Sequence, residues 1–271
     1  AGGWAGAGTF TEGTSTLVFT GSGKTWTMGS YLGDGTQYYN MTVNAPFTLK
    51  SIDNTYGSAY MVGAGTFTLG ASGTLSSTTS ETLYFGTDGS TINVSANTDG
   101  LAALHGIIAR TGSSNNLNIP ELTTKNIFVE TGDATATGDL TITTEIDVAS
   151  GTTFNANGNT IAAKVVDVNG GTLTLSGSTL NFSVTASGDQ FNLDTASTLI
   201  AGPTTTITGY SSASKTNTYV PSAGGFEVVG DVKWLDIQAD GDLTVIGSVT
   251  ACNLTGTGAN IRQFHHTIDT Q

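Results

Sequence analysis

Short apolar clusters recur about every 20 residues between positions 138 and 210, and runs of Gly, Asn, Ser and Thr separate them. The clusters align in three sets: Leu140 and Ile142 with Ile161, then Leu180 and Phe182, then Leu199 and Ile200; Ile146 and Val148 with Val166 and Val168; Phe154 with Leu173 and Leu175, then Phe191 and Leu193. Such short alternating runs predict strands that are buried on one face. Three short strands per period predict an all-β fold, a parallel β-helix or β-solenoid of about 20 residues per coil. Each coil is then stabilised by stacking on its neighbours.

Strand-like runs continue towards the N-terminus. β-branched or aromatic segments bounded by Gly, Asp and Asn occupy residues 16–19, 25–28, 38–43, 47–49, 60–62, 66–69, 82–85 and 91–94. Helical periodicity is almost absent. The best candidate is the segment 101–110 with Asp99 as its N-cap, and it predicts one or two helical turns at most, or a strand.

Changes in composition divide the chain into three parts. Residues 1–60 are an aromatic-rich N-terminal β region, which is either a wider part of the same solenoid or a separate β-sandwich, and the former is favoured. Residues 61–210 are the predicted solenoid. The segment 209–224 has the composition of a loop or linker. Because a solenoid needs something to cover its last coil, residues 225–271 are expected to form a separate cap or assembly region.

The charge balance excludes several kinds of partner. The net charge is −13, with 8 Lys and Arg against 21 Asp and Glu, and the cations are scattered along the chain. A nucleic-acid-binding protein needs a basic stripe to displace phosphate counterions, so no nucleic acid is expected as a partner. No window approaches 18 apolar residues, so no membrane insertion is expected. The single cysteine, Cys252, excludes an intramolecular disulfide framework.

Two groups of aspartates are candidate metal ligands. Asp147, Asp167 and Asp189 are 20 and 22 residues apart, close to the coil period. If they stack, like charges lie one strand spacing apart, which is unfavourable unless a cation such as Ca²⁺ intervenes. Asp240 and Asp242 resemble part of an oxygen-rich calcium loop. The alternative is that turns hold these acids apart and hydrated. No cofactor is expected unless calcium binds at these aspartates.

Catalytic patterns are weak. Glu145 and Asp147 fall on one face of a shared strand, as a glycosidase carboxylate pair requires, although any solvated strand face can carry two acids. The segment 21–25 ends like a phosphate-binding loop, but Val18 stands where that loop needs Gly, and a strand follows instead of a helix. A turn is therefore expected there. No catalytic residue is assigned, and the chain is predicted not to be an enzyme.

The repeated Gly-Thr-Leu-Thr-Leu type of strand carries a resemblance. Residues 171–180 and 65–70 resemble the coils of β-helical surface and fibre proteins, which include phage tail fibres and spikes, other virion appendages, and bacterial or archaeal cell-surface adhesins. The resemblance covers residues 60–210. It implies an oligomer, because virion proteins of this kind are commonly homotrimers. Some spikes of this kind cleave host glycans, but no motif in this chain matches their catalytic residues.

These observations lead to one expected function and two alternatives. The expected function is a non-enzymatic structural component of an exposed assembly, a virion fibre or a capsid or tail surface protein, located on the virion surface or outside the cell. Its partners are copies of itself or neighbouring structural proteins. The first alternative is a cell-surface adhesin or filament subunit that binds host surface glycans. The second is a glycan-cleaving β-helix enzyme.

Overall fold

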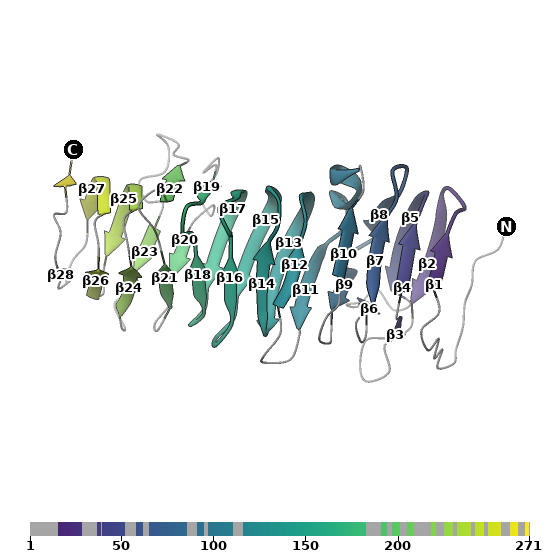
Figure 1. Ribbon diagram of the computed structural model, residues 1–271, viewed down its shortest axis with the longest axis horizontal. Helices are drawn as coiled ribbons and strands as arrows, with labels where there is room; N and C mark the ends of the chain where they lie inside the picture. The colour runs from purple at the N-terminus through teal and green to yellow at the C-terminus, as the bar shows by residue number, and fades with distance from the viewer. Residues whose placement is uncertain are drawn as a thin grey trace. The chain divides into compact units, whose positions relative to one another are not determined.

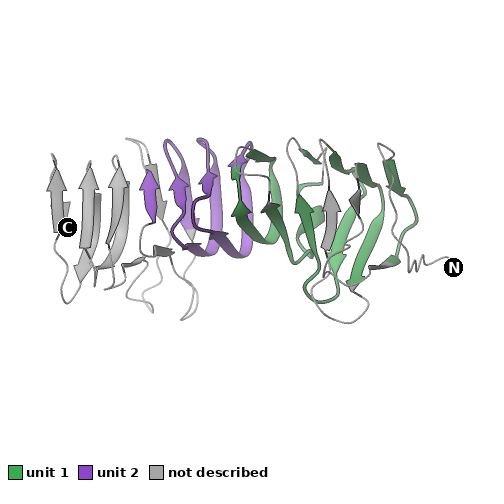
Figure 2. Ribbon diagram, turned by 90° about the horizontal axis from the view of Figure 1, so that it is seen from below, with its two compact units in different colours: residues 1–134 green, residues 135–271 purple. Residues whose placement is uncertain are grey.

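The chain is described here from a computed structural model. The backbone is described for residues 16–28, 37–38, 40–51, 58–61, 65–85, 91–94, 97–110, 116–182, 191–193, 197–200, 205–208, 218–220, 225–229, 232–239, 242–246, 249–255, 261–264 and 269–270. Side chains are described for residues 16–25, 40–50, 65–85, 91–94, 97–109, 116–181 and 197–200. The chain divides into two units, residues 1–134 and 135–271 (Figure 2).

Unit 1 is built from parallel ladders in which each strand pairs with the corresponding strand of the next coil (Figure 1). The first ladder contains β1 (Thr16–Phe19), β4 (Asn40–Val43), β7 (Thr66–Leu69) and β10 (Thr91–Val94). The second contains β2 (Lys24–Met28), β5 (Pro46–Ser51) and β8 (Thr74–Ser77). The third contains β3 (Gln37–Tyr38), β6 (Ser58–Met61), β9 (Thr82–Phe85), β11 (Gly106–Arg110) and β13 (Leu122–Thr131). β12 (Asn116–Ile119) also belongs to this unit, and β14 (Asp133–Ala136) spans the boundary.

Unit 2 continues in the same parallel manner. One ladder contains β16 (Thr153–Asn155), β18 (Thr172–Thr174), β21 (Thr198–Ile200), β24 (Gly225–Val229), β26 (Asp242–Ile246) and β28 (Ile261–Phe264). The other begins with β15 (Leu140–Val148), which pairs with β17 (Thr160–Val168). The first half of β17 pairs with β19 (Thr179–Phe182), and its second half pairs with β20 (Phe191–Leu193). It continues through β22 (Thr205–Thr208), β23 (Thr218–Val220), β25 (Val232–Ala239), β27 (Val249–Thr255) and β29 (Asp269–Thr270). The fold is therefore an all-β parallel β-solenoid, as the sequence predicted.

The core consists of apolar rows that run from coil to coil. In unit 1, Met41 stacks on Phe67, and both are fully buried, while the residues on either side of them point outward. In unit 2, Phe154 stacks on Leu173 in the same way. Because side chains alternate between the two faces of a strand, each run needs only two or three apolar residues to complete its share of the core. This explains why a chain with 37% hydrophobic residues forms so many strands.

Most expected N-terminal strands are confirmed within a residue or two, and β8 is an additional strand that the sequence did not indicate. β8 contributes a single apolar side chain, Leu75, to the core, which is too weak a pattern to detect. Strands β1, β2, β4 and β5 pair in parallel with later coils, so the described strands of the N-terminal region have the solenoid arrangement and not that of a β-sandwich.

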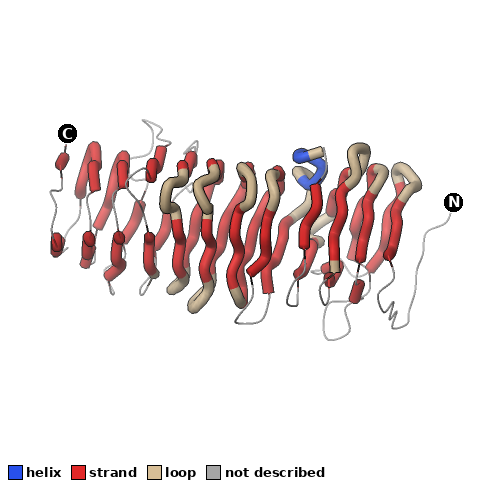
Figure 3. The backbone as a smooth tube through the Cα atoms, in the orientation of Figure 1, coloured by secondary structure: helices blue, strands red, loops and turns tan. Residues whose placement is uncertain are grey.

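The helical candidate is corrected in one respect. A single turn of 3₁₀ helix, η1 (Thr98–Leu101), precedes the strand β11, and Figure 3 shows it as the short blue segment. Its N-cap is Asn97, and Asp99 lies inside the turn, so the predicted N-cap was wrong. Gly106, which weakens a helix, begins the strand instead.

The repeat alignment is right in its first steps and wrong in its last. Ile146 and Val148 pair with Val166 and Val168, and Leu140 pairs with Ile161, as expected. However, Leu173 pairs with Leu199, Leu180 pairs with Ile207, and Phe191 pairs with Val166. The coil lengthens from 19 residues between Phe154 and Leu173 to 26 between Leu173 and Leu199, so counting in steps of 20 assigned the next strands to the wrong ladder.

The segment 209–224 was also assigned wrongly in part. Residues 218–220 form β23, which pairs in parallel with β20 and β25. The composition of this segment, rich in Ser, Thr and Asn, is that of a loop, but the strands of this protein have outward faces of the same composition.

Tight turns allow successive strands to follow one another within a coil. Asn157 and Gly158 have φ values of 51° and 79°, the two positive values of a type I′ turn, and Asn159 N–H donates to Ala156 O at 3.0 Å. Gly158 N–H donates to Ser178 Oγ of the next coil at 2.9 Å. The turns are therefore joined to one another as the strands are.

Candidate functional site

The strongest candidate site is a row of acids on the outer face of β15 and β17. Glu145 and Asp147 share β15 and alternate with buried Ile146 and Val148, so both lie on the same outward face, as expected. Asp147 is directly opposite Asp167 of β17. The expected stacking of these two aspartates is confirmed, and it places like charges one strand apart, about 4.8 Å.

The row does not continue as a third aspartate. The residue opposite Asp167 on the following strand is Asn192, and Asp189 lies outside the described residues. Asn169 lies just beyond β17, and its Nδ2 donates to Asp147 Oδ1 at 3.1 Å. An amide donor thus compensates part of the negative charge of the pair.

Burial and the neighbouring aspartates change the pKa of Glu145. Burial raises the pKa of its carboxyl group above the ordinary value, and the negative charges of Asp147 and then Asp167 raise the pKa further. β15 carries an irregularity just before Glu145, where residues 143 and 144 oppose the single residue Lys164. Such a β-bulge locally disrupts the regular pairing of the two strands next to Glu145.

The calcium hypothesis stays a prediction. Asp240 lies outside the described residues, and Asp242 is the first residue of β26 opposite Gly225, with its side chain outside the description. Within the part of the chain whose side chains are described, no group of three or more His, Cys, Asp or Glu residues is arranged to hold a metal ion. The Asp147–Asp167 pair would supply two carboxylates, fewer than the six to eight oxygen ligands that Ca²⁺ takes.

A second polar cluster, which the sequence reasoning missed, lies at the turn between β8 and β9. The carboxylate of Glu81 is fully buried and accepts four hydrogen bonds. The backbone N–H groups of Thr78 and Thr79 both donate at 2.9 Å, and their hydroxyls donate at 3.0 and 3.1 Å. Such a turn is an anion-binding nest whose anion is the chain's own side chain.

His105 lies near this cluster. Burial lowers the pKa of its imidazole, the positive charge of Lys125 lowers it further, and the negative charge of Glu81 acts in the opposite direction. The ring packs against Phe128, with 6.3 Å between the ring centroids. His105 is therefore a half-buried imidazole whose pKa lies below its ordinary value. The sequence feature that could have indicated the Glu81 cluster is the pair Thr78-Thr79 ahead of Glu81. This feature does not distinguish a buried acid from a solvated one.

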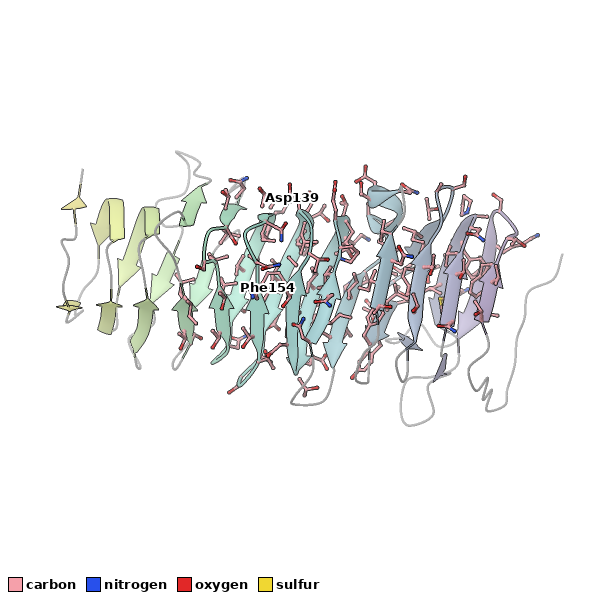
Figure 4. All side chains as sticks on the ribbon, viewed as in Figure 1. Asp139 and Phe154 are labelled. Atoms are coloured by element: carbon pink, nitrogen blue, oxygen red, sulfur yellow. The ribbon has the colours of Figure 1, made fainter. Side chains whose placement is uncertain are left out.

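Other polar side chains join neighbouring coils. Asp139 precedes β15, and its Oδ1 accepts the backbone N–H of Thr160 at 2.8 Å, while Phe154 lies in the core of the same unit (Figure 4). Ser197 is buried and accepts the N–H of Gly170 at 2.9 Å, and its hydroxyl donates to Val168 O. Thr66 Oγ1 and Thr91 Oγ1 lie 3.0 Å apart on the outer face of β7 and β10.

One expected feature of the N-terminal region, the turn at residues 21–25, can be placed. The segment 21–25 is a turn that leads into β2, with Gly23 at a φ of 65°, as expected. No helix in the described part of the chain is long and apolar enough to cross a membrane.

Comparison of the chain with protein-family models, with curated proteins and with solved structures finds no match in any of the three.

Proposed function

We propose that the chain is a non-enzymatic structural component of an exposed assembly, a virion fibre or a capsid or tail surface protein. The observation that carries this proposal is the use made of polar side chains. Asp139, Ser178, Ser197 and the Thr66–Thr91 pair all connect one coil to the next. In a binding or catalytic site, polar side chains of this kind point towards a ligand. In this protein they form hydrogen bonds that hold neighbouring coils together.

The core supports the same role. Each coil adds one residue to core rows such as Met41–Phe67 and Phe154–Leu173. The core therefore grows by adding coils in one direction. The outward positions of the described strands β7, β16 and β18 carry Thr and Asn, and the chain has a net charge of −13, which favours solubility. The resemblance of residues 60–210 to coils of virion and surface fibres points in this direction as well.

Immunogold electron microscopy of the source material tests the proposal. Antibody against this chain is expected to place gold on virus particles, and its position on head or tail distinguishes surface decoration from host attachment. Gold on cells or on free filaments would instead favour the cell-surface adhesin or filament subunit. Gold on no particle, cell or filament, together with recovery of the chain as a soluble protein, contradicts a structural role.

The acid row gives one reason to test glycan cleavage as a second candidate function. Glu145, a carboxyl group with a raised pKa, lies on the same strand face as Asp147, and glycosidases combine a protonated and an ionised carboxyl group. The test is release of reducing ends or unsaturated products from a panel of polysaccharides. Product formed by the wild type and by Glu121→Gln, a substitution of an exposed glutamate, but lost in Glu145→Gln, would establish an enzyme.

A further inference from the structure

The sequence contains two Asn-Gly pairs, Asn157–Gly158 and Asn169–Gly170, and both lie between strands of unit 2. Asparagine loses its side-chain amide most readily when glycine follows it, because glycine has no side chain to hinder attack by its own backbone nitrogen. Both glycines have the positive φ that favours glycine, 79° at Gly158 and 74° at Gly170. The backbone of these connections therefore retains glycine at the position that makes the preceding asparagine reactive.

This reaction, deamidation, needs water and no enzyme. The backbone nitrogen of the glycine loses its proton and attacks Cγ of the asparagine. An N–Cγ bond forms, the Cγ–Nδ2 bond breaks, and Nδ2 leaves with that proton as ammonia. Water then opens the cyclic imide at Cγ to give aspartate, or at the backbone carbonyl carbon to give isoaspartate. The glycine N–H is thus the group that must be released first.

A buried serine of the next coil holds this N–H in both pairs. Gly158 N–H donates to Ser178 Oγ at 2.9 Å, and Gly170 N–H donates to Ser197 Oγ at 2.9 Å. Both serine side chains are buried. A backbone N–H that is hydrogen-bonded within a fold gives up its proton only when the structure opens locally. Stacking of the next coil therefore withholds the attacking nitrogen.

The asparagine side chains are held from the other direction. Asn157 Nδ2 donates to Ala136 O at 3.2 Å, and Asn169 Nδ2 donates to Asp147 Oδ1 at 3.1 Å, and both acceptors belong to the preceding coil. Ring closure requires Cγ to move onto the glycine nitrogen, which breaks these bonds as well. Each Asn-Gly pair is therefore bonded to the preceding coil through its amide and to the following coil through its glycine.

We propose that Asn157 and Asn169 are sites of spontaneous deamidation, and that Ser178 and Ser197 suppress the reaction while the coils remain stacked. The proposal goes beyond the structural role and does not depend on it. At Asn169 the product is a carboxylate in place of the amide that donates to Asp147, so an attraction between two coils becomes a repulsion. Deamidation at this position therefore opposes the return of an opened coil to its place.

The test uses the full chain with Ser178→Ala and Ser197→Ala, and each variant is the matched control for the other. The proteins are incubated in mildly alkaline buffer, and peptide mapping by mass spectrometry follows the loss of amide and the formation of isoaspartate at each asparagine. Ser178→Ala is expected to accelerate deamidation at Asn157 alone, and Ser197→Ala at Asn169 alone. The expected acceleration is about fivefold, the factor that corresponds to the loss of one hydrogen bond.

Two further measurements keep the result clear. Hydrogen exchange at Gly158 and Gly170 is expected to rise in the same variant in which the preceding asparagine reacts faster. Wild type alone provides a comparison that needs no folded variant, because both rates are expected to be at least about tenfold higher in denaturant than in the folded protein. Equal rates in folded and unfolded wild type overturn the proposal. A folded serine variant with an unchanged rate at its own asparagine, or with equal acceleration at both, also overturns it.

Discussion

Two buried threonine hydroxyl groups differ in their contribution to stability because only one of them has a hydrogen-bond partner. Thr124 and Thr152 are both buried, but Thr152 Oγ1 donates to Ala149 O at 2.8 Å, while Thr124 Oγ1 has no hydrogen-bond partner among the described residues. A buried polar atom without a partner loses its hydration and gains nothing in return, whereas a bonded one contributes to stability.

Replacing these two threonines by valine should therefore have opposite effects. Thr124→Val exchanges an unpartnered hydroxyl for a methyl group of similar shape and is expected to stabilise the protein by about 1 kcal/mol. Thr152→Val is expected to destabilise it by about 1 kcal/mol, because a turn hydrogen bond is lost. Denaturant midpoints of the two variants check this. Equal shifts in the same direction would show that the hydroxyl of Thr124 has found a partner.

Glu145 gives the protein a pH dependence with a definite sign. Its pKa is raised in the folded state, so the folded state binds the proton more tightly than the unfolded state. The stability that results is complete below the unfolded pKa of about 4.3 and is lost as the pH rises through the higher folded pKa. Glu145→Gln is expected to be more stable than wild type at pH 7, with the difference shrinking towards pH 4.

Melting temperatures between pH 4 and pH 7 measure this effect. Glu121→Gln removes the same charge from an exposed position and is the control for the change in net charge. If the two variants show the same pH profile, burial and the neighbouring aspartates do not act on Glu145.

At the scale of the strand and turn, the close approach of one coil to the next constrains the glycines. A Cβ on Gly171 would lie 2.6 Å from Ala149 O and 2.8 Å from Val148 Cγ1, atoms of the preceding coil. A Cβ on Gly158 would meet nothing within 4 Å, although its φ is 79°. The first glycine is required by packing between coils and the second by the shape of its own turn.

Alanine substitutions should separate these two requirements. Gly171→Ala forces the backbones of two coils apart and is expected to cost about 3 kcal/mol. Gly158→Ala adds only the strain of a left-handed residue, about 1 kcal/mol. The denaturant midpoint should fall further for the first variant. The reverse order would indicate that the turn, and not the coil spacing, limits the structure.

At this scale the sequence predicted the strands well and the register only locally. The Val148–Val168 row and the Asp147–Asp167 pair followed from spacing, because coils of nearly constant length convert sequence distance directly into contact. Leu199 was assigned to the wrong ladder because its coil is longer. The four hydrogen bonds to Glu81 and the hydrogen bonds of the buried Ser197 hydroxyl depend on the conformation of turns. The spacing of residues in the sequence does not predict that conformation.

For the chain as a whole, repetition predicts that coils are interchangeable. In unit 2, Val148 and Val168 occupy equivalent places on neighbouring coils. Deleting residues 149–168 joins Val148 directly to Asn169, so that Val148 takes the position that Val168 held. Every later strand then keeps the same face inward. Removing one rung from a quasi-one-dimensional fold costs the stability of that rung and of one interface between neighbouring rungs.

The deletion of residues 149–168 is expected to give a folded protein with an unchanged type of β spectrum and a slightly lower melting temperature. Deletion of residues 149–158 is the matched control, because it removes half a coil and brings Asn159 to the place of Ala149. Strands then enter the wrong ladders, and the variant is expected to aggregate or unfold. Circular dichroism and thermal melting compare the two proteins. A half-coil deletion that folds equally well would contradict the coil assignment.

The turn at Asn157 and Gly158 has a consequence for how such a protein changes over generations. The turn is bonded to its neighbours through Asn157 Nδ2 and Gly158 N–H, but a side chain added at Gly158 would meet nothing within 4 Å, whereas Phe154 and Leu173 are buried between coils. Mutations at the turn alter what an outside molecule meets without disturbing the rows that hold the coils together. Outward-facing turn positions of this kind can therefore vary more freely between related sequences than the residues of the inner rows.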